Sequence, residues 1–216
     1  WNNTSSGTTS TAFGRNNIAS GLGSIALGYY CQSYGQYSTA IGGDFGLGNQ
    51  TATGSTYGFA SGGRAYSYLY GQFSYAGGYF AAIGDSQQSS FLPKREAALT
   101  TGATTILSLD GTGTTNLVIP NGTNRAWNVT VKWVAVVRVI TGTATGVSVG
   151  DTIMQVQTLG FKRVLGTSSL VGTANTISTN SDTFNKYYRG KFGFKFEKSR
   201  IYKFDYKFKE RFYNLD

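Results

Sequence analysis

The residues of this chain best suited to binding chemistry lie near its carboxyl end, where lysine or arginine alternates with phenylalanine or tyrosine. Four of these cations fall in one short segment, at Lys195, Arg200, Lys203 and Lys207. In a strand, strict alternation places the aromatic rings on one face and the cations on the other. Clustered cations attract anions, so the segment is a candidate contact for an acidic surface polymer such as lipopolysaccharide phosphate or acidic glycan. The simpler alternative is a terminal hairpin whose lysines keep an edge strand from pairing wrongly.

A second candidate for binding is the run of tyrosine and phenylalanine between positions 57 and 80. Most of these rings are expected to pack against one another, because aromatic side chains bury large areas. Some are candidates for stacking on sugar rings at the surface. Tyr68 and Tyr70 are therefore named, with the four cations, as candidate surface-ligand contacts.

Catalytic chemistry has little support in the composition. The chain has no histidine, which removes the usual general base, the usual zinc ligand and any Ser-His arrangement. Its ten acidic residues are scattered, whereas a glycosidase needs two positioned carboxylates. No glycine-rich phosphate-binding motif occurs either. We therefore predict that the protein is not an enzyme and has no cofactor site or metal site.

Glycine recurs every seventh residue through the first third of the chain. Nine of the twelve multiples of seven up to position 84 are glycine, and these predicted structural glycines are Gly7, Gly14, Gly21, Gly28, Gly35, Gly42, Gly63, Gly77 and Gly84. A fixed short period indicates one structural unit that is stacked many times. The period is disturbed between Gly42 and Gly77, where bulges or small loops are expected.

The residues between these glycines predict strands. Ser24–Gly28 and Ser38–Gly42 share a small-x-Ala-x-Gly frame, and Phe80–Gly84 repeats it. This period of two places Ser, Ala and Gly on one face of a strand and Ile, Leu or Thr on the other. Two strands and two corners make one fourteen-residue coil, so residues 1–84 are expected to form six coils. Cys31 is expected to replace one of the repeat serines as a small packed residue.

One coil of this size encloses almost no core, so several copies of the chain are expected to pack together. Small residues permit close approach of backbones, and the Ala/Ser/Gly face is therefore the predicted contact between copies. These repeats resemble the head repeats of trimeric autotransporter adhesins, the YadA-like heads, which also occur as modules in bacteriophage tail fibres. The resemblance covers about residues 10–84. It implies a left-handed parallel β-roll, a homotrimer, and display outside a cell or on a virion.

The middle of the chain is predicted to be an antiparallel β domain of sandwich or jelly-roll type. Residues 106–119 are typical of a hairpin around Asp110-Gly111-Thr112-Gly113, and residues 129–140 of a strand with apolar residues on one face. Further strands are expected at 152–158, 161–165 and 170–177. No helix of ordinary length is indicated anywhere.

A second resemblance begins at Gly84-Asp85-Ser86-Gln87 and continues through Leu107-Ser108-Leu109-Asp110-Gly111. It is similar to the β domain that follows YadA-like repeats in many phage tail-fibre proteins, and it covers roughly residues 84–180. This favours a phage fibre over other carriers of such repeats. The carboxyl end departs from that pattern, because a basic-aromatic terminal hairpin at 190–213 replaces a plain apolar closing strand.

The distribution of charge agrees with this division of the chain. The chain has a formal net charge of +9, of which residues 1–92 contribute zero, residues 93–180 contribute +4 and residues 181–216 contribute +5. The predicted domains are a β-roll stem at 1–84, a connector at 85–99 and a β domain at 100–216. Basic residues concentrate at one end, so a cell-surface polymer is favoured over nucleic acid as the partner. No apolar run approaches the ~20 residues that cross a membrane, so no membrane insertion is expected.

The sequence therefore predicts a homotrimeric segment of a virion tail fibre that attaches to host cell-surface polysaccharide or another receptor. Other virion fibre or tail proteins are its expected neighbours, and its location is extracellular. Two alternatives stay open: the head domain of a bacterial trimeric autotransporter adhesin, and a purely structural fibre component without receptor binding. Avidity would be the mechanism of attachment, since three weak sites on a rigid stem engage many copies of a ligand together.

Overall fold

The computed structural model describes residues 2–43, 48–96, 104–112, 125–140, 148–164, 167–181, 194–195 and 205–207. Within these residues all regular structure is β, and no helix occurs. Two units are distinguished, one made of residues 1–97 with 106–118 and the other of residues 98–105 with 119–216. Each unit is described by itself.

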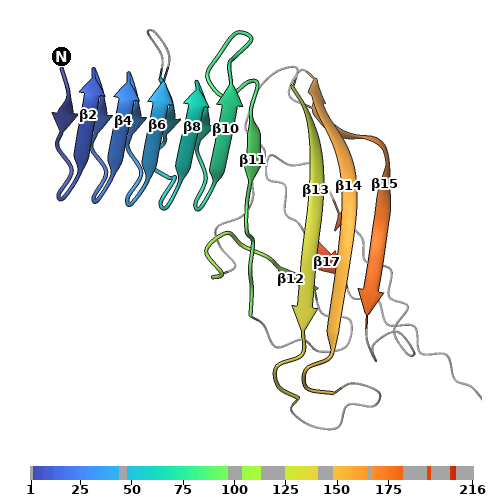
Figure 1. Cartoon of the computed structure of the whole chain (residues 1–216). Coiled ribbons are helices and arrows are strands. Elements are labelled where there is room, and N and C mark those ends of the chain that lie inside the picture. Colours follow the sequence, from blue (N-terminus) through green and yellow to red (C-terminus); the bar gives the residue numbers. More distant parts are fainter. Residues whose placement is uncertain are drawn as a thin grey trace, which may run out of the picture. The chain divides into compact units, whose positions relative to one another are not determined.

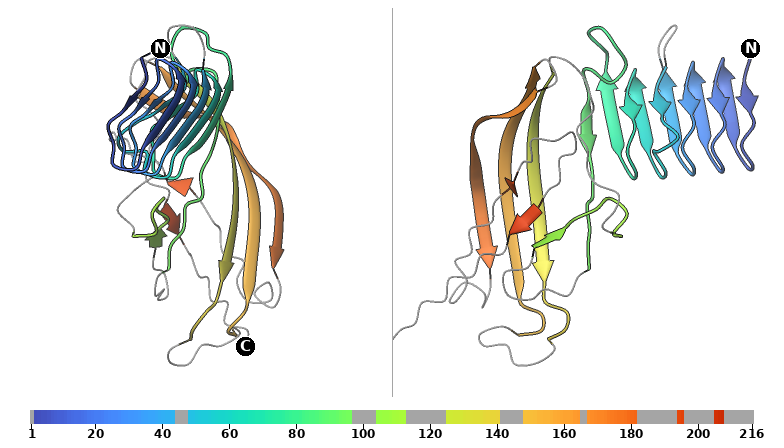
Figure 2. Two further views of the ribbon diagram at one scale, coloured as in Figure 1. Left: turned by 60° about the vertical axis from the view of Figure 1, so that its left-hand side comes forward. Right: turned by 180° about the vertical axis from the view of Figure 1, so that it is seen from behind.

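The first unit is a parallel β-solenoid in which short and long strands alternate along the chain (Figure 1). Two-residue strands form one sheet in the order β1-β3-β5-β7-β9, and longer strands form the other in the order β11-β10-β8-β6-β4-β2, in which β11 is Gln88–Ser90. Viewed nearly along its axis, the solenoid shows its rungs stacked one behind another (Figure 2). The solenoid strands are β1 (Thr4–Ser5), β2 (Thr11–Arg15), β3 (Ile18–Ala19), β4 (Ile25–Tyr29), β5 (Gln32–Ser33), β6 (Thr39–Gly43), β7 (Gln50–Thr51), β8 (Phe59–Gly63), β9 (Tyr66–Ser67) and β10 (Phe73–Gly77).

The small residues of the repeat point into the coil. Ala26, Ala40 and Ala60 are fully buried, while Phe13 and Ile41 of the same sheet are exposed. The predicted alternation is therefore confirmed, but the predicted contact between copies through the Ala/Ser/Gly face is wrong. A coil of fourteen residues is narrow, and its alanine and serine side chains fill the interior, so this face is buried within one chain. The outward face of the long strands, with Phe13 and Ile41, is exposed in the single chain.

Extra residues interrupt the repeat in the middle of the solenoid. Thr11 pairs with Ile25 and Phe59 with Phe73, steps of 14 residues, whereas Thr39 pairs with Phe59, a step of 20. Four of the six extra residues lie between the starts of β6 and β7 and two between those of β7 and β8. The expected irregularity between Gly42 and Gly77 is confirmed, and the strands resume in register beyond it.

The solenoid has about five turns and not the predicted six. Its last long parallel strand is β10, and residues 80–84, which carry the strand-like frame, lie in turns and bends. The Asp85 carboxylate accepts hydrogen bonds from the backbone N–H groups of Phe80, Ala81 and Ala82. These N–H groups are thus bonded to a side chain and cannot serve a strand ladder. β11 (Gln88–Ser90) then pairs antiparallel with β10 and closes the sheet.

The second unit contains a three-stranded antiparallel sheet in the order β13-β14-β15. One face of this sheet is buried at Gln157, Leu159 and Phe161 of β14, and Phe161 pairs in register with Trp127 of β13. The remaining strands of the chain are β12 (Thr104–Ile106), β13 (Arg125–Val136), β14 (Thr152–Val164), β15 (Thr167–Ser181), β16 (Phe194–Lys195) and β17 (Asp205–Lys207). A separate small sheet has the order β12-β17-β16.

These strands differ in detail from the predicted ones. The two strands expected at 152–158 and 161–165 are one strand, β14, because Gly160 continues the ladder where a break was expected. The pairing of β14 with β15 shifts register on either side of Thr158. The strand expected at 129–140 ends at Val136. Asp110 accepts bonds from the backbone N–H and hydroxyl of Thr112, which forms a local turn, while the second half of that predicted hairpin lies outside the described residues. A sandwich arrangement of the sheets stays a prediction.

Candidate functional site

The interior of the solenoid is a ladder of hydroxyl groups. Ser33, Ser38 and Thr51 are fully buried, and their hydroxyls lie within 2.7–3.2 Å of one another. Ser38 also donates to the backbone carbonyl of Gly35 at 2.6 Å. In the rung before, Ala19 stands where Ser33 stands, and the buried hydroxyl of Ser24 has no hydrogen-bond partner among the described residues. The rungs are thus rigid where hydroxyls pair, and they hold the outer faces in fixed geometry.

A column of amide side chains joins successive rungs at one corner. Asn17 donates to the carbonyls of Phe13 and Gly28, and its Oδ1 accepts from the backbone N–H of Cys31. Asn49 repeats this arrangement two rungs later, accepting from the N–H of Ala65. The buried Cys31 occupies the same column between these two asparagines, so it is equivalent to asparagine and not to a repeat serine as expected. Burial raises the pKa of the Cys31 thiol.

The predicted structural glycines fall into several groups. Gly14, Gly28 and Gly42 pair in one column of the long-strand sheet, where a Cβ on any of them would overlap a carbonyl of the next rung. Gly7, Gly21 and Gly35 line a second column with the same restriction. The extra six residues shift the later period, so Gly62 continues the first column. Gly63 and Gly77 pair with each other one position further on, with no atom closer than 3.8 Å to an added Cβ, and Gly84 lies in the following loop.

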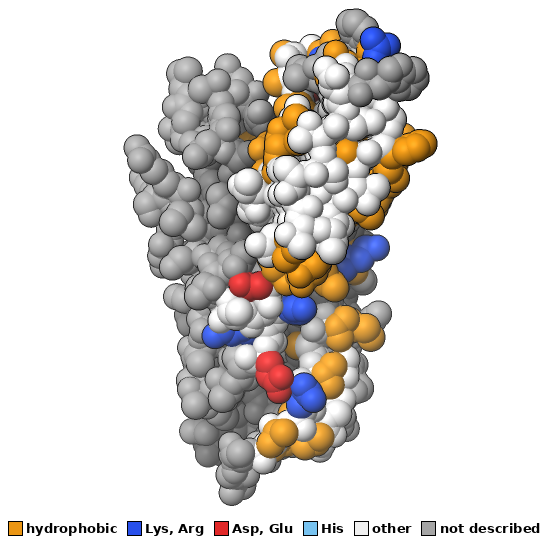
Figure 3. Space-filling view, turned by 90° about the vertical axis from the view of Figure 1, so that its left-hand side faces the viewer, with side chains coloured by type: hydrophobic (Ala, Val, Ile, Leu, Met, Phe, Trp, Pro, Cys, Tyr) orange, Lys and Arg blue, Asp and Glu red, His pale blue; other side chains and the backbone are white. Residues whose placement is uncertain are grey.

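The outward side of the long strands is an apolar face. It contains two columns of residues, Thr11, Ile25, Thr39, Phe59 and Phe73 in one and Phe13, Leu27, Ile41, Ser61 and Tyr75 in the other. Phe13 is 74% exposed, Phe73 49% and Tyr75 53%. The rings of Phe59 and Phe73 stack at 5.0 Å. Viewed from the amino-terminal end of the solenoid, hydrophobic side chains gather along its sides, around a largely polar end (Figure 3).

The outward side of the short strands differs in character, and we call it the amide-tyrosine face. Gln32, Gln50 and Tyr66 follow one another in register, and the Gln50 side-chain amide donates to Oε1 of Gln32 at 2.8 Å. Beside them runs a second column, Tyr34, Ala52 and Tyr68. Its register follows from the backbone bonds of Tyr34 to Thr51 and of Ala52 to Ser67. All six side chains are half-buried.

Tyr70, one of the predicted contacts, belongs to a separate tyrosine stack at a corner of the solenoid. The rings of Tyr37 and Tyr57 stack at 5.5 Å, and Tyr70 meets Tyr57 edge-on at 5.5 Å. Tyr37 packs over the backbone of Gly23, where a Cβ would be too close to its ring. The ring faces of this stack contact one another, so the stack supports the corner. Tyr68 instead contacts Tyr66 of the amide-tyrosine face, with ring centroids 5.9 Å apart.

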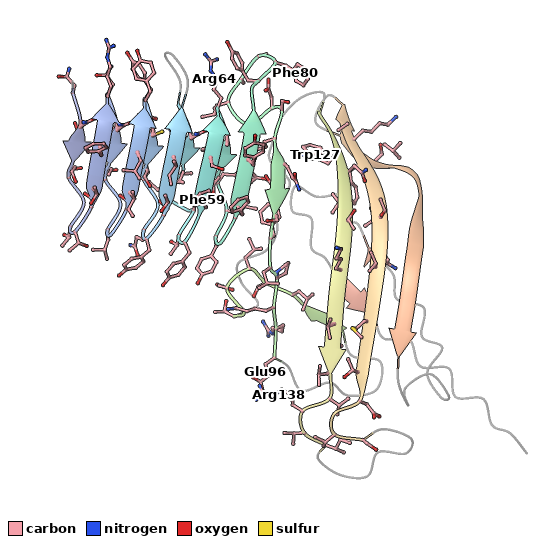
Figure 4. All side chains as sticks on the ribbon, in the orientation of Figure 1. Phe59, Arg64, Phe80, Glu96, Trp127 and Arg138 are labelled. Atoms are coloured by element: carbon pink, nitrogen blue, oxygen red, sulfur yellow. The ribbon has the colours of Figure 1, made fainter. Side chains whose placement is uncertain are left out.

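The junction after the solenoid is a cap that sequence reasoning did not identify. The Gln87 side chain bonds the backbone groups of Tyr66 that a further rung would otherwise bond. Its Oε1 accepts from the backbone N–H of Tyr66, and its Nε2 donates to the carbonyl of Tyr66. The guanidinium of Arg64 lies 3.4 Å from the centre of the Tyr79 ring. Phe80 of this loop is 85% exposed and lies with Arg64 at the same edge of the solenoid (Figure 4). The Gly-Asp-x-Gln pattern was the available signal for this cap.

Two of the four predicted cationic contacts lie beyond the described residues. Arg200 and Lys203 are outside them, while Lys195 and Lys207 are backbone positions of β16 and β17. These strands pair antiparallel, as in the predicted hairpin, and Lys195 stands opposite Asp205. An acid therefore occupies the paired position of one predicted cation. Among the described residues there is no group of three or more metal-ligating side chains. Nor does this part of the chain hold a helix of the length and apolarity that a membrane crossing requires.

Comparison with known families agrees with this geometry. Residues 5–30 match the model of the YadA head domain repeat in two copies. This segment includes the strands β2, β3 and β4, the first regular rungs of the solenoid. The parallel β-roll and the match together support YadA-like head repeats at residues 5–30. No curated protein and no solved structure gives a significant match.

Proposed function

We propose that this chain is a segment of a trimeric extracellular fibre that attaches to a cell surface, and that the fibre is a phage tail fibre. The observation that carries the proposal is the apolar face of a solenoid built from YadA-type head repeats. A solvent-exposed stripe of this length is typical of a surface that binds another protein.

The partner that best fits the apolar face is two further copies of the same chain. Fully burying one large apolar side chain contributes about 1.5–3 kcal/mol, and the face carries at least five that are exposed: Phe13, Ile25, Ile41, Phe73 and Tyr75. Among the described residues, the fully buried side chains of the coils are small or polar, so packing between copies would supply a large apolar core. Closed cyclic symmetry leaves no part of the face unpaired.

Attachment is proposed to work by avidity. Three copies on one rigid stem engage many copies of a surface ligand at once, which increases overall affinity without strengthening any single contact. Tyr68 and the four cations of the terminal segment are the proposed contacts, and the protein binds its ligand without transforming it. Other fibre or tail proteins of the virion are the proposed neighbours.

The match to head repeats also favours the head of a bacterial trimeric autotransporter adhesin as the second candidate. The two carriers share the solenoid and the trimer. The phage assignment has support from the Gly84-Asp85-Ser86-Gln87 junction and the β-rich unit after it, which resemble phage fibres.

A cell-adsorption experiment tests the proposal. The native mass of the purified chain is measured by light scattering, and its adsorption to candidate host cells is compared with that of a variant in which Lys195, Arg200, Lys203 and Lys207 are all replaced by Gln. We expect a mass of three chains and adsorption that the variant reduces. Monomeric wild-type protein would refute the trimer, and unchanged adsorption of the variant would remove the cations from the proposal.

A further inference from the structure

We propose that the amide-tyrosine face of the solenoid is a binding site for an uncharged glycan. The proposal rests on the attachment function and names a site and a ligand class for it. The site consists of Gln50 and Ala52 from one rung, flanked by Tyr34 one rung earlier and Tyr68 one rung later.

The spacing of the rungs gives the site its dimensions. Tyr34, Ala52 and Tyr68 follow one another in one outward column, so the two tyrosines are two rungs apart. At ~4.8 Å per rung this separation is close to 10 Å. A sugar ring in contact with an aromatic ring on each side needs roughly 3.5–4 Å per contact, which two rungs provide. Ala52 is the residue between them in this column, and its side chain ends at Cβ.

Hydrogen-bonding groups stand beside the same space. Gln50 pairs in register between Gln32 and Tyr66, and one of its amide hydrogens is donated to Gln32 at 2.8 Å. An amide offers two donors and one acceptor oxygen, so Gln50 retains both kinds of group for a ligand. Adjacent sugar hydroxyls are donors and acceptors at once. The combination of an aromatic surface with a fixed amide therefore suits a sugar ring.

The ligand class follows from the absence of charge on this face. Its outward positions along the described rungs hold serine, threonine, isoleucine, glutamine, alanine and tyrosine only. An acidic polymer would gain nothing from this surface, because no cation is there to meet it. An uncharged polysaccharide loses no charge hydration on binding and uses both ring stacking and amide hydrogen bonds.

The neighbouring structure keeps the site in place. The rings of Tyr66 and Tyr68 contact each other. The backbone N–H and the carbonyl of Tyr66 are both hydrogen-bonded to the side-chain amide of Gln87. The inward residues Ser33, Thr51 and Ser67 of the same strands are fully buried. Outward substitutions at 34, 50, 52 and 68 therefore change the surface without entering the core.

Affinity electrophoresis of the full chain tests the proposal, in native gels that contain dextran, mannan or galactan, or the acidic polygalacturonate. We expect at least one neutral polymer to retard the wild-type protein. The double variant Tyr34→Ala, Tyr68→Ala and the single variant Gln50→Leu should each weaken this retardation at least fivefold. Ala52→Lys fills the space without removing a contact, and it should weaken binding to the same extent.

Tyr37→Ala is the matched control, because it removes a tyrosine of the solenoid surface outside the site; its retardation should equal that of the wild type. Folding of every variant is checked by circular dichroism and thermal melting. Retardation by polygalacturonate alone, retardation by no polymer, or equal retardation of the wild type and Ala52→Lys would each overturn the proposal. Cell adsorption of the same variants separates the two proposals: undiminished adsorption refutes this site and leaves the attachment function standing.

Discussion

At the scale of single residues, this solenoid is stabilised by polar groups in an interior where the described part of the chain buries no large apolar side chain completely. Asn17, Asn49, Ser38 and Thr51 are fully buried, and each makes hydrogen bonds to backbone or to another side chain. An unsatisfied buried polar group costs about 1–3 kcal/mol, so stability depends on the completeness of these ladders. Serine, asparagine and threonine are usually assigned to loops, which explains why the sequence pattern alone did not reveal the asparagine column.

Two serines at equivalent positions should respond differently to removal of the hydroxyl. Ser38→Ala is expected to lower the free energy of unfolding by about 1–2 kcal/mol, because Ser33 and Thr51 lose a buried partner. Ser24→Ala should be neutral or stabilising, since its hydroxyl is buried without a partner among the described residues. Urea unfolding of both variants measures the difference. Equal losses would show that the ladder does not contribute to stability.

Cys31 gives a prediction about pH. Burial raises the pKa of its thiol, so the folded state favours the neutral form, while the unfolded thiol ionises near its ordinary value of about 8.5. The contribution to stability is therefore complete below that value and is lost as the pH rises above it. Cys31→Asn should be at least as stable as wild type at pH 7, because Asn17 and Asn49 already fit this column, and should lose less stability between pH 8 and 10.

Urea midpoints of both proteins at pH 7, 8 and 10 measure this prediction. Cys31→Ser is the control for loss of the thiol without gain of the amide. A Cys31→Asn protein that melts well below the wild type at pH 7 would show that the column does not accept an amide there.

At the scale of elements, the sequence predicted the repeating unit better than its boundaries. The strand frames at Ser24–Gly28 and Ser38–Gly42 became β4 and β6, because alternation of small and large residues specifies which side faces a narrow core. The frame at Phe80–Gly84 failed, since the Asp85 carboxylate binds the N–H groups that a strand would use. Sequence period alone carries no information about such a competing side-chain bond.

The candidate sites were predicted less completely. Tyr68 was named from local aromatic density, but Tyr34 and Gln50 lie 34 and 18 residues before it in the chain. They meet it only through a register that depends on two insertions, of four and two residues. Without the lengths of the loops that absorb these insertions, the column containing both tyrosines could not be aligned.

The glycine columns can be tested with two alanine substitutions. Gly28 has a φ of +122°, and a Cβ there would overlap the carbonyl of Gly42 in the next rung. Gly28→Ala should therefore destabilise the solenoid by about 3 kcal/mol or more, through strain at this backbone and a clash that the neighbouring rung cannot avoid. Gly77→Ala should change stability by less than about 1 kcal/mol, because an added Cβ there meets no atom within 4 Å.

Thermal melting by circular dichroism separates these variants. Similar losses for both would show that the first column is no more restricted than the position of Gly77. Both glycines fall on a multiple of seven, so a difference between the two variants would show that the seven-residue period alone does not identify the glycines that the structure requires.

At the scale of the whole molecule, the two outer faces of the solenoid differ in chemical character. The apolar face carries exposed phenylalanine and isoleucine, whereas the amide-tyrosine face carries half-buried polar and aromatic side chains. Burying the first between copies leaves the second exposed on every copy, because they belong to different sheets of the same coil. The proposed assembly and the proposed ligand binding therefore use different residues, and we expect substitutions to change one without the other.

Disrupting assembly should therefore reduce attachment while each chain remains folded. Ile25→Lys with Ile41→Lys places two cations in the middle of the apolar face, at outward positions that the coil interior does not use. The native mass should fall from three chains to one, since burying an unpaired charge costs several kcal/mol. Adsorption to cells should fall by roughly 10²–10⁴, because avidity is lost with the trimer.

Thr8→Lys with Gln36→Lys is the matched control, as it adds the same charge at exposed turn positions that belong to neither outer face. This control should remain trimeric and should adsorb to cells within a few-fold of the wild type. If the isoleucine variant stayed trimeric, the apolar face would not be the interface between copies. If it became monomeric and still adsorbed as tightly as the wild type, a single chain would suffice for attachment, and the repeat would serve the fibre by its length and stiffness alone.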